Sequence, residues 1–148
     1  MTRNLAYWDL APEIPEKIAD INAYLKSSDL EHDLQHLVLL RVSQINKCAY
    51  CVDLHSKHAL RDGETITRLN SLCVWNECDL FSDRERAALE WAEALTELLR
   101  DNEMDRAYLQ VSKQFEGKAL ADLTFLITTM NAWNRMSIGL GRRLAAEA

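Results

Sequence analysis

The sequence predicts an all-α fold, a bundle of helices in a single domain over residues 1–148. Apolar residues recur at helical spacing along almost the whole chain, and no run alternates apolar and polar residues as a strand does. Only 4 glycines and 2 prolines occur among the 148 residues. Neither a linker nor a repeat nor a low-complexity segment divides the chain, which favours one domain.

The first two helices have recognisable start signals. Pro12 and Pro15 precede a first helix that is expected to extend to about Leu25. Ser28-x-x-Glu31 has the form of a capping box, which predicts that a second helix starts there. The apolar stripe of this second helix comprises Leu34, Leu37, Val38 and Val42.

The next two helices are delimited by a glycine and a threonine. The helix that contains the first two cysteines is expected to end at Gly63, which suits a C-terminal cap. Thr65 or Thr67 then starts a short helix that extends through Leu72.

Three further signals divide the second half of the chain. Ser82-x-x-Glu85 is a second capping box. Asp105 is expected to cap the following helix, and Gly117 separates that helix from a long final one. Behind Ser82 the apolar stripe comprises Ala88, Trp91, Ala92, Leu95 and Leu99.

Charge and hydropathy argue against nucleic-acid and membrane partners. The net charge is −6, and the basic residues form no stripe along the sequence. The most apolar stretch, residues 120–140, contains Asp122, Asn131, Asn134 and Arg135, as a helix buried in protein does. The first residues lack the apolar segment of a signal peptide, so a cytoplasmic protein is expected.

The most informative motif is Cys48-Ala49-Tyr50-Cys51 followed by His55. In a helix these spacings place both thiols and the imidazole on one face. Because a cytoplasmic chain of this size needs no disulfide for stability, the motif indicates redox or metal chemistry. The helix N-terminus and Lys47 favour a low pKa for Cys48, whereas the base one turn away favours Cys51 as the nucleophile. We favour Cys51, because a base within reach also serves proton transfer.

The segment from Leu39 to Lys57, together with Asn131-Ala132-Trp133-Asn134-Arg135, resembles the AhpD-like branch of the carboxymuconolactone decarboxylase family. The resemblance extends over residues 34–143. It implies an all-helical subunit in a homo-trimer or homo-hexamer, with thiol-dependent peroxidase or disulfide reductase activity and no cofactor. By this resemblance Cys51 attacks the hydroperoxide, Cys48 resolves the sulfenic acid, and His55 belongs to a proton relay. An external dithiol then reduces the disulfide.

One position departs from the family pattern. The peroxidases of the family have a glutamate twelve residues before the first cysteine as the base of the relay, and this chain has His36 there. A histidine is also a base near neutral pH, so His36 either replaces the glutamate with a different pH optimum or leaves the relay broken. A broken relay would affect peroxide turnover more than dithiol chemistry.

Other interpretations of these residues remain open. A zinc site at the motif would need a fourth ligand from His58, Cys73 or Cys78, and no second ligand pair is present, so no metal is expected. Cys73 and Cys78 are otherwise expected to be buried small hydrophobes, and His32 and His58 to be solvated. Tyr50 is expected to point away from the thiols.

Two alternatives to a peroxidase remain within the same fold, besides a disulfide reductase. One is a redox sensor without turnover, and the other is a decarboxylase-like protein that binds small molecules. Residues 120–140 are apolar on two faces, one of which includes Leu126, Trp133, Met136 and Leu140. A chain of this size has little interior to cover both, which independently favours a homo-oligomer.

Overall fold

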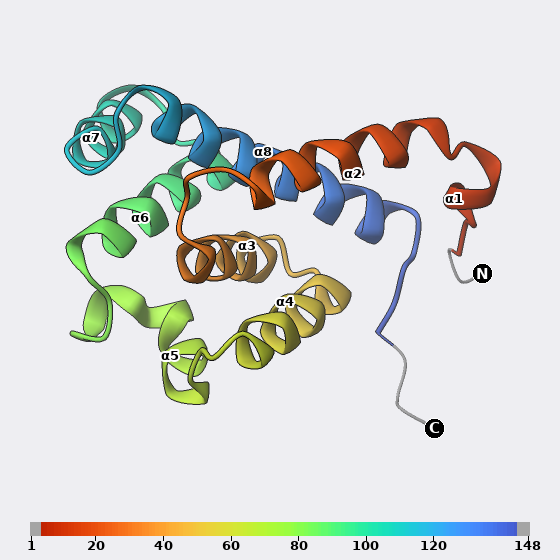
Figure 1. Cartoon of the computed structure of the whole chain (residues 1–148), viewed down its shortest axis with the longest axis horizontal. Helices are drawn as coiled ribbons and strands as arrows, with labels where there is room; N and C mark the ends of the chain where they lie inside the picture. The colour runs from red at the N-terminus through yellow and green to blue at the C-terminus, as the bar shows by residue number, and fades with distance from the viewer. Residues whose placement is uncertain (1–3, 145–148) are drawn as a thin grey trace.

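The computed structural model describes residues 4–144, and every regular element among them is a helix (Figure 1). The predicted all-α class is therefore confirmed. The elements are α1 (Tyr7–Leu10), α2 (Glu13–Lys26), α3 (His32–Ile45), α4 (Ala49–Arg61), α5 (Ile66–Ser71), the 3-10 helix η1 (Leu72–Glu77), α6 (Asp83–Glu97), α7 (Asp101–Val111) and α8 (Gly117–Gly139).

Helix α3 is the centre of the bundle. It contacts α4, α6 and α8, while α2 lies along α8 (Figure 1). Its apolar stripe is buried as predicted, because these helices cover it on three sides. The main core includes Leu34, Val38 and Val42 of α3, Trp91 of α6, Leu123 and Ile127 of α8, and both cysteines of the motif.

Several predicted helix ends are confirmed. Ser82 and Glu85 form the capping box of α6, with the Ser82 backbone N–H donating to the Glu85 carboxylate at 2.7 Å. Thr65 caps α5 by accepting a hydrogen bond from the Arg68 backbone N–H. Gly63, with φ of +104°, follows the end of α4.

Three predicted helix starts are wrong. Pro12 is the N-cap of α2, so Pro15 lies within the helix. Ser28 does not open α3, because its hydroxyl donates to the Leu25 carbonyl at 2.7 Å and so serves the end of α2. Asp105 lies inside α7, which begins four residues earlier at Asp101.

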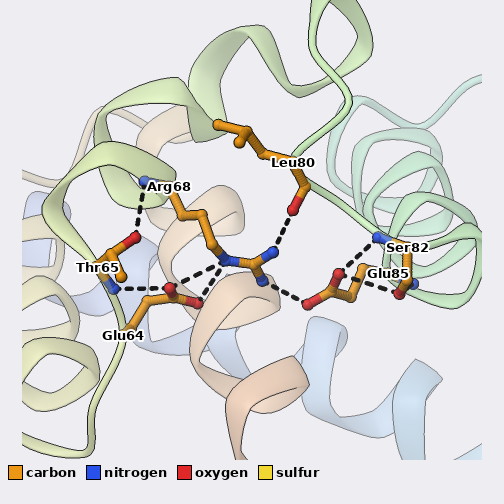
Figure 2. A network of polar contacts seen from close by, with 6 residues as sticks. All are labelled: Glu64, Thr65, Arg68, Leu80, Ser82 and Glu85. Atoms are coloured by element: carbon orange, nitrogen blue, oxygen red, sulfur yellow. Dashed lines mark hydrogen bonds and ion pairs between the residues drawn. The ribbon is translucent and has the colours of Figure 1, made fainter.

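The segment between α5 and α6 is held by Arg68 (Figure 2). Its guanidinium pairs with Glu64 at 3.0 Å and with Glu85 at 2.5 Å. It also donates to the Leu80 carbonyl and lies over the ring of Phe81. These contacts join the start of α5, the loop after η1 and the start of α6. Phe81 is thereby fixed in a second core cluster, which also supports α3 and α4.

Both apolar faces of the final helix are largely covered within the chain itself, although the chain was expected to have too little interior for both. Leu123, Ile127 and Met130 of one face are buried; on the other, Leu126 is buried and Trp133, Met136 and Leu140 are half-buried. The exposed large apolar residue nearest the middle of α8 is instead Phe125. Within residues 4–144 no helix has the length and apolar character needed to cross a membrane.

Candidate functional site

The two cysteines of the motif form a disulfide at the start of α4. Cys48 is the N-cap residue, and Cys51 lies in the first turn, where its backbone N–H points to the Cys48 sulfur at 3.4 Å. Both sulfurs lie at the positive end of the helix dipole, which stabilises a thiolate when the disulfide is reduced. Both residues are buried, at 1% and 3% exposure.

Amide side chains hold the turn that leads into α4. The Asn46 amide donates to the side-chain oxygens of Asn131 and Asn134, both at 2.9 Å. Asn134 is fully buried. The two asparagines of the apolar helix α8 thereby tie the α3–α4 turn to α8. The position of Cys48 follows from that turn.

Next to the disulfide lies a pocket of about 550 Å³ between α2, α3, α4 and α8. Cys51 lines the pocket and Cys48 does not. A molecule in the pocket therefore meets the second cysteine of the motif first. The other lining side chains include His36 and Leu39 of α3, Tyr50, Leu54, His55 and His58 of α4, Leu126, Met130 and Trp133 of α8, and Trp8, Lys26, Asp62 and Arg142.

His55 follows Cys51 by one helical turn and lines the same pocket. Burial, followed by the neighbouring His58 and His36, lowers the pKa of His55 to about 4. At neutral pH His55 is therefore a neutral imidazole that can accept a proton. A nearby thiolate would stabilise its protonated form, so the titrations of Cys51 and His55 are coupled in the reduced protein.

His36 also reaches the pocket, and it has a carboxylate partner that sequence reasoning missed. Its Nε2 lies 2.9 Å from an oxygen of Asp62, while its Nδ1 is buried without a hydrogen-bond partner in the described chain. Hydrogen bonds from Arg61, and then from His36, lower the pKa of Asp62 to about 2. No motif marks Asp62, because it lies at the end of α4 and meets His36 only through packing of α3 on α4.

The pocket wall contains further residues that the sequence did not single out. Tyr50 was expected to point away from the thiols, but it lines the pocket, and Arg142 lies 3.9 Å above its ring. Trp8 stacks on Trp133 with ring centroids 5.9 Å apart. His58 also lines the pocket and is half-buried, contrary to the solvated position expected. No local pattern in the sequence predicts that α1 and the segment after α8 pack against the bundle.

The two remaining cysteines lie elsewhere. Cys73 is exposed and Cys78 is half-buried, so the prediction that both are buried is wrong. Cys73 lies in η1, and Cys78 is the residue that follows it. Among residues 4–144 no three histidine, cysteine or acidic side chains are arranged to hold a metal ion.

Comparison with known proteins agrees with the fold. The model of the carboxymuconolactone decarboxylase family matches residues 12–94, which include α2 to α5, most of α6 and the cysteine motif. The chain belongs to this family. Within the family it is 37% identical over 147 residues to YdfG, an uncharacterised protein of Bacillus subtilis, covering 99% of this chain and 100% of YdfG. It is 33% identical to YnjA of Escherichia coli, also uncharacterised, over 86% of this chain and 70% of YnjA.

A solved structure places the chain in the AhpD-like branch of the family. The crystal structure is of an Agrobacterium tumefaciens protein of unknown function, suggested to be the antioxidant defence protein AhpD. It superimposes with a TM-score of 0.91 at 33% sequence identity, covering 99% of this chain and 100% of that one. The predicted family and branch are thus confirmed.

Proposed function

We propose that this protein reduces hydroperoxides through a dithiol–disulfide cycle between Cys51 and Cys48. The observation that carries the proposal is the disulfide at the start of α4, of which one partner, Cys51, lines a pocket together with His36 and His55. The resemblance of the chain to a protein named for antioxidant defence supports the same function.

The cycle has three steps. The Cys51 thiolate attacks the terminal oxygen of the hydroperoxide, the O–O bond breaks, and the alcohol leaves with a proton. The resulting sulfenic acid on Cys51 is attacked by the Cys48 thiolate, which releases water and forms the disulfide. An external dithiol of another molecule then supplies two electrons and two protons and becomes a disulfide itself.

The histidines supply and accept the protons of this cycle. His55 takes the proton of the Cys51 thiol and returns a proton to the departing alkoxide. His36 exchanges protons with His55 and is oriented by its hydrogen bond to Asp62, which occupies Nε2 and leaves Nδ1 toward the buried side. His36 thus takes the place of the glutamate of the peroxidases.

The first test is rapid mixing of the reduced protein with hydrogen peroxide and with an organic hydroperoxide, with the thiols then counted by mass spectrometry. We expect rapid formation of the Cys48–Cys51 disulfide, loss of this reaction in Cys51→Ser, and an unchanged rate in Cys73→Ser. Oxidation no faster than that of a free thiol would contradict the proposal and favour a disulfide reductase. Rapid oxidation that no dithiol reverses would favour a redox sensor.

The role of His36 has its own test. We expect His36→Gln to lower the rate of peroxide-dependent disulfide formation by about 10²-fold, the low end for loss of a positioned base. His36→Glu should restore part of the rate and shift its optimum to lower pH, because a carboxyl group has a lower pKa than an imidazole. Asp33→Asn, at an exposed position of the same helix that does not line the pocket, is the control. Equal rates in all these variants would show that His36 has no part in the relay.

A further inference from the structure

The charge along the pocket differs in sign from that of the chain. The whole chain has a net charge of −6, but three cationic side chains line the pocket, against the single carboxylate of Asp62. These cations are Lys26, Arg61 and Arg142. Asp62 is already paired with Arg61 at 2.9 Å and with His36, so it neutralises neither of the others. The pocket therefore carries uncompensated positive charge.

Lys26 is the cation available to a ligand. Arg142 donates to the Tyr50 hydroxyl at 2.5 Å, whereas Lys26 has no hydrogen-bond or ion-pair partner among the described residues. Its backbone position is fixed, because the buried Gln35 amide donates to the carbonyls of Leu25 and Leu30 at 3.1 and 3.0 Å. The end of α2 is thus fastened to α3 at the residue next to Lys26.

Lys26 and Cys51 lie toward different ends of the pocket, because α2 ends beside the first turn of α3, whereas α4 begins just after α3 ends. His58 also lines the pocket. Burial is the main cause that lowers the pKa of His58, and the charges of Arg61, His36 and Lys26 add to the effect, while the charge of Asp62 opposes it. His58 follows Cys51 by seven residues of α4, which is about 10 Å along the helix. The wall between the two ends includes the apolar side chains of Leu39, Leu54, Leu126 and Met130.

The size of the pocket also indicates a larger ligand than hydrogen peroxide. Its volume of about 550 Å³ greatly exceeds the roughly 30 Å³ that one water molecule occupies. An apolar wall with a few polar groups at defined places is typical of sites for medium-sized organic molecules.

We infer that the pocket binds organic hydroperoxides that carry a carboxylate at the far end of an apolar chain of medium length. The carboxylate pairs with Lys26, the chain lies on the apolar wall, and the hydroperoxide reaches Cys51. This inference rests on the proposed function, and the reaction is the same: the hydroperoxide becomes an alcohol, the two thiols become a disulfide, and the carboxylate is unchanged.

Binding of a carboxylate can be tested without turnover. Calorimetric titration of the oxidised protein with octanoate and with neutral octanamide compares two ligands that differ mainly in charge. We expect octanoate to bind about fivefold more tightly, and Lys26→Gln to remove that difference. Lys17→Gln, at an exposed lysine of the same helix that does not line the pocket, should leave it unchanged. Equal binding of the two ligands, or equal losses in both variants, would overturn the inference.

A kinetic experiment distinguishes failure of this inference from failure of the proposed function. Reduced protein is mixed with a hydroperoxide of octanoic acid and with the methyl ester of the same compound. We expect Lys26→Gln to raise the KM for the acid about fivefold, with little change in kcat and none for the ester. Octanoate binding that depends on Lys26, without peroxide-driven oxidation of Cys51, would refute the proposed function alone. Rapid oxidation with no preference for the acid would refute the anion site alone.

Discussion

At the scale of single residues, the site depends on which groups of α4 meet the pocket. Cys51 and His55 line it, one turn apart, while Cys48 lies behind at the N-cap. From the sequence, the helix dipole favours Cys48 as the nucleophile, whereas the nearby base favours Cys51. Access adds a third argument that favours Cys51, because a peroxide in the pocket does not meet Cys48.

The lowered pKa of His55 predicts a pH dependence of stability. The pKa is about 4 in the folded protein and about 6.5 in the unfolded chain, so the unfolded chain binds more protons between these values. The contribution of His55 to stability is therefore complete above pH 6.5 and falls as the pH is lowered toward 4, by up to roughly 3 kcal/mol.

Urea unfolding of the oxidised protein from pH 4 to 7 measures this effect. We expect His55→Gln to flatten the dependence, whereas His32→Gln, at an exposed histidine, should keep the slope of the parent protein. Parallel curves for the parent and His55→Gln would show that His55 is not buried as a neutral imidazole.

At the scale of elements, the sequence predicted those helix starts that depend on a local hydrogen bond. The capping box at Ser82 and the cap at Thr65 are present, because each hydroxyl meets the backbone N–H three residues later. Ser28 failed, since the end of α2 competes for the same hydroxyl. Sequence spacing alone does not decide between the end of one helix and the start of the next.

The residues of the site likewise fall into those that the sequence predicts and those that it does not. Cys48, Cys51 and His55 follow from spacing within one helix, and the family resemblance pointed to His36. Asp62, Trp8 and Arg142 come from outside that pattern and reach the pocket through packing, so no local rule marks them. Sequence reasoning therefore singled out the groups that we propose to react, but not the walls of the pocket.

The Arg68 network predicts a large effect from one substitution distant from the pocket. Arg68→Gln leaves the half-buried carboxylates of Glu64 and Glu85 without their shared cation, which should lower the free energy of unfolding by about 2 kcal/mol. Chemical denaturation measures it. Arg106→Gln, whose carboxylate partner lies 3.9 Å away at the surface, should cost less than about 0.5 kcal/mol. Similar losses in both variants would mean that the network in Figure 2 adds nothing beyond a surface ion pair.

At the scale of the whole molecule, apolar residues remain exposed on three neighbouring helices. Both apolar faces expected along residues 120–140 are largely covered within the chain, so a different surface is available for assembly. It includes Ile14, Ile21 and Tyr24 of α2, Tyr108 and Leu109 of α7, and Phe125 and Ile138 of α8. We propose that this surface joins copies of the chain, since an isolated subunit rarely exposes so many large apolar side chains together.

Sedimentation velocity tests this assembly. We expect the protein to sediment as a homo-oligomer, a trimer or a hexamer, and Phe125→Glu to shift it toward smaller species, because a carboxylate would be buried at the contact. Ile66→Glu is the matched control. Its side chain is similarly exposed, at 58% against 56% for Phe125, and α5 lies on the opposite side of the molecule from α8 (Figure 1). A monomeric parent protein, or equal shifts in both variants, would contradict the proposal.

The central claim is that Cys51 is the sulfur that reacts with the hydroperoxide. In Cys48→Ser the sulfenic acid has no resolving thiol and should persist long enough to be trapped. The most direct measurement is mass spectrometry of this variant after one equivalent of organic hydroperoxide and a sulfenic-acid reagent. We expect one adduct per chain on Cys51, with one equivalent of alcohol released. An adduct on Cys73 or Cys78 instead, or full recovery of the hydroperoxide, would contradict it.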